Sequence, residues 1–262
     1  MNINIILLLV GFLASVVGAI CGIGGGVIIK PVLDSIGFAK ADTISFLSGL
    51  TVLCMSGYSM IKSLINKEKI DLTTGTPLAI GAAFGGIAGK RLFNMIKSNS
   101  SNPSLVGGVQ ALSLGIATLL TLIYTLKSKN IKTKKVSNPF VCAGIGLVLG
   151  LMSSFMGIGG GPFNLAVLSY FFSMETKEAG RSSLYIILVS QIFSLLTTFV
   201  TKSVPRYQPI WVIIMRSAGI IGGIVGRNIN KKISAQTVNK LFIAFMFVII
   251  GISIFNTYKA FR

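Results

Sequence analysis

Long apolar runs separated by short charged segments dominate this chain of 262 residues. A helix needs about 20 predominantly apolar residues to cross the hydrocarbon core of a membrane. The pattern therefore predicts an all-α integral membrane protein, and the scarcity of alternating apolar and polar residues argues against a membrane β-barrel. The predicted apolar elements are residues 3–38, 44–65, 72–91, 105–126, 140–172, 184–200, 210–226 and 238–255.

Two of these elements are too long for one crossing, and each contains a glycine cluster. Residues 22–26 read Gly-Ile-Gly-Gly-Gly, and the same five residues recur at 157–161, an offset of 157 − 22 = 135. Glycine is less favourable than alanine inside a helix by about 1 kcal/mol. Four glycines in five positions therefore predict a break in both helices.

The order of elements also repeats. Residues 85–90 (Gly-Gly-Ile-Ala-Gly-Lys) match residues 222–227 (Gly-Gly-Ile-Val-Gly-Arg) at an offset of 222 − 85 = 137. We expect two homologous halves of about four transmembrane elements each, residues 1–126 and 138–262, with the first element of each half broken at its cluster. The small residues of these matching segments recur at helical spacing, which predicts close helix packing.

A lysine-rich linker at 127–137 joins the halves and is expected to be cytoplasmic, because cytoplasmic loops carry excess positive charge. Its lysines are Lys127, Lys129, Lys132, Lys134 and Lys135. If each broken element crosses the membrane once, the halves are parallel. If each returns to its own side, the halves are inverted repeats, which we favour because both breaks then meet near the membrane midplane.

Composition narrows the classes of function. Hydrophobic residues make up 52% of the chain and charged residues 11%, while the net charge is +18. The positive charges lie mostly in short loops, where they face anionic lipid headgroups, so we expect no nucleic-acid partner. The chain has no histidine and its three cysteines are not at metal-ligand spacing. We expect no enzyme activity, no cofactor and no metal.

The glycine clusters are the strongest candidates for a binding site. A break frees backbone N–H groups that lipid cannot satisfy, and a helix that restarts behind bare glycines presents a partial positive charge to an oxyanion. The alternative is that the glycines only permit tight packing. The candidate binding residues in the clusters are Gly22, Gly24, Gly25, Gly26, Gly157, Gly159, Gly160 and Gly161.

The two clusters, with Pro31-Val32-Leu33 after the first, resemble the paired glycine motifs of the sulfite exporter TauE/SafE family. The second cluster is followed by Ala166-Val167-Leu168, which lacks the proline. The resemblance covers nearly the whole chain. It implies an integral membrane transporter for small anions, commonly sulfur-containing ones such as sulfite, sulfonates or thiosulfate.

Hydroxyl residues that open the helix after each broken element resemble a further motif of that family and are candidate substrate ligands. They are Thr43, Ser45, Ser182 and Ser183.

Other polar residues within apolar runs are candidates because their burial in a membrane is costly. Asn164 follows the second cluster, and Gln191 lies in the middle of an element, where a hydrogen bond between helices is an equal explanation. Arg181 is placed to pair with a sulfonate or to anchor at the interface. Arg216 is expected to extend toward the interface.

Lys30 and Asp34 lie four residues apart after the first cluster. They form either an ordinary i, i+4 ion pair or a functional pair, in which Lys30 attracts an anion or Asp34 couples a proton.

These features predict a secondary transporter for a small anion, and the alternative is a passive anion channel. No Walker-type phosphate-binding motif is present, so coupling to a proton or sodium gradient is expected rather than ATP hydrolysis by this chain. The predicted location is the plasma membrane, as a multi-pass protein in contact with lipid, and a homo-oligomer is compatible with the sequence.

Overall fold

The computed structural model describes residues 2–68, 70–99 and 103–262. The described residues are all-helical and contain no β-strand. The helices are α1 (Ile3–Cys21), α2 (Gly26–Ile36), α3 (Ala41–Ile65), α4 (Leu72–Asn99), α5 (Pro103–Lys127), the 3-10 helix η1 (Ser128–Asn130), α6 (Pro139–Phe155), α7 (Pro162–Phe172), α8 (Thr176–Val200), α9 (Pro209–Lys232) and α10 (Ala235–Phe261).

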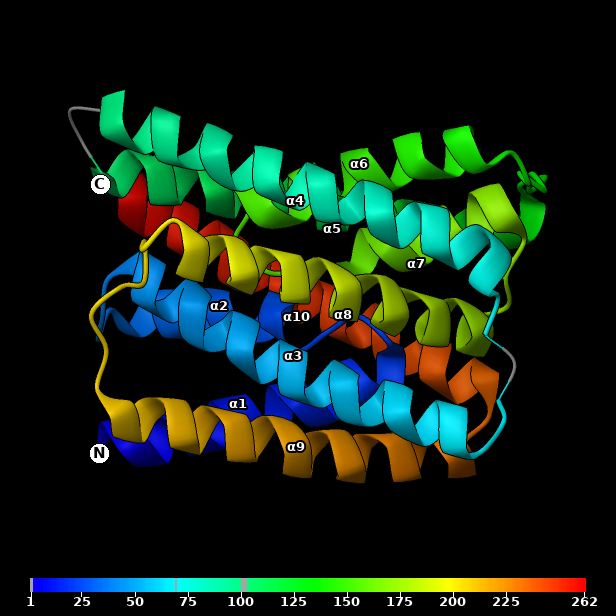
Figure 1. Ribbon diagram of the computed structural model, residues 1–262, viewed down its shortest axis with the longest axis horizontal. Helices are drawn as coiled ribbons and strands as arrows, with labels where there is room; N and C mark the ends of the chain where they lie inside the picture. The colour runs from blue at the N-terminus through cyan, green and yellow to red at the C-terminus, as the bar shows by residue number, and fades with distance from the viewer. Residues whose placement is uncertain (1, 69, 100–102) are drawn as a thin grey trace.

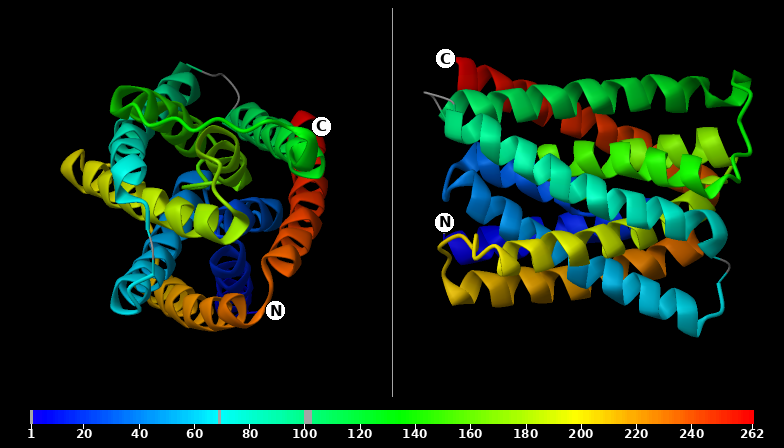
Figure 2. Two further views of the ribbon diagram at one scale, coloured as in Figure 1. Left: turned by 90° about the vertical axis from the view of Figure 1, so that its right-hand side faces the viewer. Right: turned by 45° about the horizontal axis from the view of Figure 1, so that its top comes forward.

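The long helices run side by side along the long axis of the molecule (Figure 1). Both termini lie at one end, which we call the terminal end. The connection between α5 and α6 lies at the opposite end, the linker end. Seen end-on, the short helices α2 and α7 lie near the middle of the bundle and the longer helices surround them (Figure 2).

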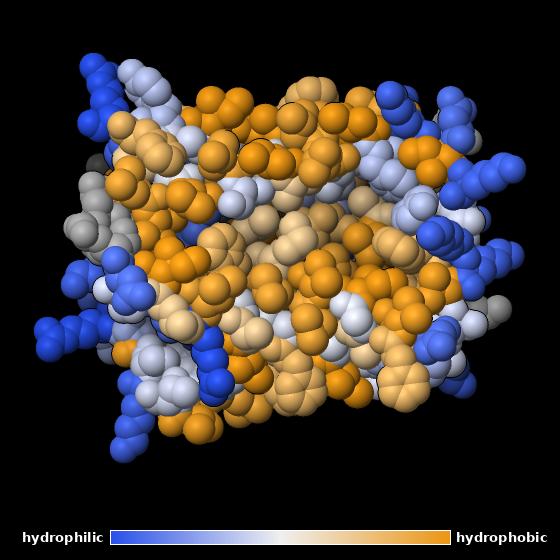
Figure 3. Space-filling model, turned by 90° about the horizontal axis from the view of Figure 1, so that it is seen from above, coloured by the Kyte–Doolittle hydropathy of each residue, from blue (hydrophilic) through white to orange (hydrophobic). Residues whose placement is uncertain are grey.

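Six helices of the described chain are long and apolar enough to cross a membrane: α1, α3, α5, α8, α9 and α10. An apolar belt occupies the middle of the face in Figure 3, and hydrophilic side chains gather at its two ends. A surface of this kind is stable when lipid covers the belt and water covers the ends. The chain is therefore a multi-pass membrane protein.

Glycines at helical spacing bring two pairs of helices into backbone contact. Gly85 and Gly89 of α4 lie against the carbonyls of Leu147 and Leu151 on α6, so closely that a Cβ atom would overlap each oxygen. Gly222 and Gly226 of α9 lie in the same way on the carbonyls of Phe12 and Val16 on α1. This confirms that these glycines serve helix packing.

Helix boundaries differ from the sequence prediction mainly where charged residues lie inside a helix. α8 begins at Thr176, about two turns before the predicted start at 184, so Arg181 lies inside the helix instead of opening it. α4 extends to Asn99 and α9 to Lys232. The apolar pattern failed here because helix ends outside the hydrocarbon core can be polar.

Candidate functional site

The first glycine cluster forms a turn between α1 and α2. Gly22 caps α1 with a φ of 76° and Gly24 has a φ of 73°, a left-handed conformation that side chains rarely adopt. The N–H groups of Gly22 and Ile23 both donate to the carbonyl of Gly18. The chain then re-enters a helix at Gly26.

The second cluster repeats this geometry between α6 and α7. Gly157 and Gly159 have φ values of 69° and 68°, close to those of Gly22 and Gly24. The N–H of Ile158 donates to the carbonyl of Ser153, and Ser153 matches Gly18 at the 135-residue offset. Pro162 begins α7, where its missing N–H leaves no hydrogen bond unmade.

The two clusters touch one another inside the protein. Gly26 lies against the carbonyl of Ile158, so closely that a side chain at Gly26 would overlap that oxygen. The side chain of Ile187 on α8 lies beside both Gly24 and Gly160. Segments 135 residues apart thus share one buried location between α2, α7 and α8.

Each cluster also contacts the long helix that comes two helices after the other cluster's starting helix: the second cluster contacts α3, and the first cluster contacts α8. A Cβ at Gly157 would lie 2.9 Å from the Ser45 hydroxyl on α3, and a Cβ at Gly22 would overlap the backbone of Gly180 on α8. Ser45 and Gly180 differ by the same 180 − 45 = 135 residues. The second cluster therefore contacts α3 at the position that matches the contact of the first cluster with α8.

A cavity of about 260 Å³, the terminal-end cavity, reaches the second cluster. Gly157 and Gly159 line its inner part, together with Gln110 of α5 and Gln191 of α8. Its lining continues to Ser203 in the α8–α9 connection, which lies at the terminal end (Figure 1). Hydroxyl, amide and ammonium donors dominate its polar lining, in Ser45, Lys90, Asn94, Gln110, Ser154, Gln191, Ser194, Thr198 and Ser203, and Asp42 adds one carboxylate.

Lys90 is the only cation in that lining as described. Its ammonium group donates a hydrogen bond to the Thr198 hydroxyl, and the charge of Asp42 acts on it. An ammonium group fixed by a hydroxyl beside amide and hydroxyl donors can attract a small anion and hold its oxygens.

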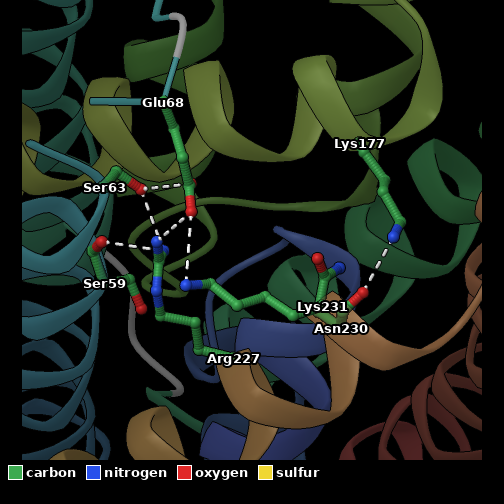
Figure 4. Close-up of polar contacts among 7 residues, drawn as sticks. All are labelled: Ser59, Ser63, Glu68, Lys177, Arg227, Asn230 and Lys231. Carbon is green, nitrogen blue, oxygen red and sulfur yellow. Dashed lines mark hydrogen bonds and ion pairs between the residues drawn. The ribbon is translucent and has the colours of Figure 1, made fainter. Parts of the chain in front are cut away.

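A second cavity, the linker-end cavity of about 250 Å³, reaches the first cluster at Gly22. Its lining includes Cys21, Gly180 and Arg181, and also Arg227, whose network of polar contacts is drawn in Figure 4. Arg227 donates to the Glu68 carboxylate at 2.6 Å, to the Ser63 hydroxyl at 2.9 Å and to the Ser59 carbonyl at 3.0 Å. These contacts join α9 to α3 and to the α3–α4 connection.

The charge of this network is balanced at Glu68. Burial alone would raise the pKa of this carboxyl, but the nearby charge and hydrogen bond of Arg227, the Ser63 hydrogen bond and the charge of Lys231 together hold the pKa below its usual value. Glu68 is therefore ionised at neutral pH and pairs with Arg227.

The candidates from the sequence fall into separate places. Ser45, Gly157, Gly159 and Gln191 line the terminal-end cavity, whereas Gly22 and Arg181 line the linker-end cavity. Asn164 is buried beside Gly159 and Gly160, around a space of only about 10 Å³. The candidates that line none of the four cavities described here are Gly24, Gly25, Gly26, Thr43, Gly161, Ser182 and Ser183.

Several of these remaining candidates have a contact of their own. The Thr43 hydroxyl donates to the carbonyl of Arg206 at 3.0 Å. Ser182 and Ser183 are buried, and their hydroxyls have no hydrogen-bond partner among the described residues.

Sequence reasoning missed Gln110, Lys90 and Arg227. Gln110 is a polar residue inside an apolar run, which is the signal that singled out Gln191. Lys90 and Arg227 both follow the matching glycine segments, at an offset of 227 − 90 = 137. Because the two positions match, the sequence alone could have indicated a pair of basic residues with matching roles.

Comparisons with known proteins agree with this architecture. The family model of the sulfite exporter TauE/SafE matches residues 7–254. The chain is 24% identical to the probable membrane transporter protein YunE of Bacillus subtilis, over 89% of this chain and 91% of that protein. It is 26% identical to the probable membrane transporter protein MJ0441 of Methanocaldococcus jannaschii, over 88% of each chain. No solved structure matches. A family match across nearly the entire chain shows that this protein belongs to the sulfite exporter TauE/SafE family of membrane transporters.

Proposed function

We propose that the chain is a secondary transporter that moves a small, sulfur-containing anion by alternating access to a site between its two glycine clusters. The observation that carries the proposal is the pair of cavities at opposite ends. The terminal-end cavity reaches Gly157 and Gly159, and the linker-end cavity reaches Gly22. Because the clusters touch at Gly26 and Ile158, the two cavities approach one location from opposite sides.

The matched lining of the cavities supports an inverted repeat. Lys90 and Ser194 line one cavity, and the residues equivalent to them in the other half, Arg227 and Ser59, line the other. α1 begins at the terminal end, and α6, its equivalent in the second half, begins at the linker end (Figure 1). Inverted repeats allow one protein to open toward either side by exchanging the conformations of its halves.

The cavities differ in how they are closed. At the linker end, Arg227 pairs with Glu68. At the terminal end, Lys90 donates to Thr198, and Ser203 occupies the position equivalent to Glu68 (203 − 68 = 135), so the counterpart of the Arg227–Glu68 pair cannot form at that position. The carboxylate of that cavity is Asp42, on α3. We infer that this conformation admits substrate from the terminal end and that the Arg227–Glu68 pair closes the linker end.

The chemistry of the terminal-end cavity supports an anionic substrate. Lys90 supplies a positive charge, and Gln191, Gln110 and Ser45 supply neutral donors near the glycines. A volume of about 260 Å³ accommodates a small oxyanion with some of its hydration water. The resemblance to the family, with its sulfite exporter description, supports a sulfur oxyanion as substrate.

A passive anion channel is the alternative. It needs a continuous pore, whereas the contact between Gly26 and Ile158 separates the two cavities and the Arg227–Glu68 pair closes the linker end. Their separation favours a carrier over a channel.

Uptake into liposomes that contain the purified protein tests the proposal. The substrates to compare are sulfite, thiosulfate, sulfoacetate, taurine, sulfate, chloride and formate. A carrier gives saturable uptake and exchange of internal for external anion, whereas a channel gives unitary currents and no saturation at low concentration. Lys90→Gln should weaken uptake, and failure of every anion to cross faster than in protein-free liposomes would overturn the proposal.

A further inference from the structure

Lys30 is a buried cation beside the second glycine cluster. It lies in α2 and is only 4% exposed. A Cβ at Gly157 would lie 2.7 Å from Lys30 Cε and 2.9 Å from the Ser45 hydroxyl oxygen, so the Lys30 side chain passes behind the wall of the terminal-end cavity. A charge in this position is costly unless it is paired.

The partners of Lys30 connect it to that cavity. Its ammonium group donates to Asp34 Oδ2 at 2.6 Å and to Gln110 Oε1 at 3.3 Å. The Gln110 amide nitrogen in turn donates to the carbonyl of Phe155, the last residue of α6 before the second cluster. A chain of hydrogen bonds therefore runs from Asp34 through Lys30 and Gln110 to the start of the cluster.

Asp34 faces another space, the α2 cavity, of about 390 Å³. The Asp34 side chain is 26% exposed, and the same cavity is lined by Lys259 and Ala260 near the end of α10, which lies at the terminal end (Figure 1). Water at that end can therefore supply a proton to Asp34. The charged residues that line this cavity, as far as it is described, are Lys30 and Asp34 from α2 and Lys259 from α10, and Lys259 is exposed and donates to the carbonyl of Ser35. The other lining groups are neutral; they come from α2, the start of α3 and the connection before it, α5, α10, and the turn after α6. Gln110 lines both this cavity and the terminal-end cavity.

Packing alone does not require the Lys30–Asp34 pair. The equivalent helix α7 has the same length of 11 residues, and at the positions of Lys30 and Asp34 it carries Leu165 and Ser169 (165 − 30 = 135). Leu165 is buried, so an apolar side chain fills this place in the other half. Apolar replacements of buried ion pairs are often neutral or stabilising, and the retained pair therefore calls for a function.

Charge balance indicates that function. Lys30 and Asp34 together are neutral, and so are Lys90 and Asp42, the two charged residues described in the lining of the terminal-end cavity. A monovalent anion bound near Gly157 would therefore leave one uncompensated negative charge in the membrane interior. A proton added to an Asp34 carboxylate oxygen removes that excess and leaves the charge of Lys30 to balance the anion. We propose that Lys30 balances the charge of the bound anion while Asp34 takes up a proton. Each monovalent anion then binds together with one proton, which enters through the α2 cavity.

This inference rests on the proposed function, and proton uptake on anion binding tests it. Methanesulfonate is a suitable probe because it is monovalent and stays ionised near neutral pH. It is added to the purified full-length protein in weakly buffered detergent solution, and a pH-indicator dye reports the protons taken up while calorimetry reports the anion bound. We expect about one proton per bound anion, and an apparent Kd that rises about tenfold per pH unit above the apparent pKa of the site.

Three variants test whether Asp34 is the residue that takes up the proton. Asp34→Asn should bind methanesulfonate without proton uptake and with a Kd independent of pH, whereas Lys30→Met should bind it at least about tenfold more weakly. Lys259→Gln, which changes the exposed cation of the same cavity, should retain the uptake of one proton. Anion binding by the wild-type protein without proton uptake would overturn the coupling alone. Absence of binding for methanesulfonate and for every anion of the uptake series would overturn the proposed function as well.

Discussion

The Arg227 guanidinium lies 2.6 Å from the Glu68 carboxylate and joins α9 to the α3–α4 connection, and both residues line the linker-end cavity. The exposed fractions of the two side chains are 10% and 22%. Cys21 lines the same cavity and is 1% exposed, so its thiol can report how often this end opens.

Glu68→Gln should accelerate the modification of Cys21 by a water-soluble thiol reagent in a protein that also carries Cys54→Ala and Cys142→Ala. A partly exposed ion pair contributes about 0.2–1 kcal/mol, so we expect a rate increase of up to about fivefold. Lys231→Gln is the matched control, because Lys231 is 46% exposed and lies 3.6 Å from the same carboxylate. An equal or slower rate in Glu68→Gln would show that the pair does not close this end.

The stability contributed by this pair should depend on pH in one direction. The pKa of Glu68 in the folded protein lies below its ordinary value of 4.5, so the folded state favours the ionised carboxylate. The contribution is fully present above about pH 4.5 and is lost as the pH falls through the lowered pKa. The Tm difference between wild type and Glu68→Gln should therefore be constant from about pH 8 to pH 5.5 and shrink in more acid solution. A difference that grew on acidification would contradict this assignment.

Gly159→Ala should abolish anion uptake while the protein still inserts. A Cβ there would overlap the Gln191 amide, and the φ of 68° adds strain of about 1 kcal/mol or more. Gly37→Ala is the control, because Gly37 has a φ of 72° but no atom within 4 Å of the added Cβ. Loss of uptake in Gly159→Ala alone assigns the effect to the cavity, whereas equal loss in both variants assigns it to backbone strain.

Bulkier substitutions at the clusters should act in the same way. Gly160→Val should abolish uptake, because Gly160 has a φ of 149° and Ile187 lies 2.6 Å from a Cβ there. Gly25 has a right-handed conformation, and the atom nearest to a Cβ added there is the Ala14 carbonyl oxygen, at 3.0 Å. Gly25→Val should therefore impair uptake through a shift of α1. Wild-type uptake in both variants would leave the clusters as packing devices.

Gly146→Ala should lower the Tm of the protein in detergent, because the added Cβ would overlap the Leu78 carbonyl and force α6 away from α4. Overpacking of this kind costs about 1–3 kcal/mol. Gly144→Ala, one half-turn away on the same helix, meets no atom within 4 Å and should leave the Tm unchanged or slightly higher. Similar losses in the two variants would rule out the close contact as the cause.

The two ends of the molecule should lie on opposite sides of the membrane. A cysteine at Lys132, in a protein without native cysteines, should react with an impermeant reagent only after cells are permeabilised, and one at Arg206 should react in intact cells. The positive charge of the linker is the physical reason. Labelling of Lys132→Cys in intact cells would reverse the orientation.

Local chemistry made much of the fold predictable. Apolar runs located the helices, and the spacing of Gly85 and Gly89 revealed a packing face, because both signals depend only on neighbouring residues. Which helix packs against that face depends on the tertiary structure. The contact of Gly85 with Leu147 could therefore not be derived from the spacing of the glycines.

The candidate site was less predictable for the same reason. Gln191 was identifiable as a polar residue inside an apolar run and Ser45 as a hydroxyl residue that opens a helix, but their meeting with Gln110 depends on how α3, α5 and α8 assemble. The ion pair of Arg227 with Glu68 was missed because the apolar pattern ends before Arg227, whereas the helix continues.

The pairing of α1 with α9 and of α4 with α6 has a consequence for biosynthesis. α1 packs on the glycine-lined face of α9, which comes much later in the chain, and α6 packs on the glycine-lined face of α4. α1 therefore enters the membrane long before the ribosome has made the helix against which it packs. During that interval its contact face is open to lipid, so a fragment of the chain that ends before α9 leaves the contact face of α1 without the helix that covers it.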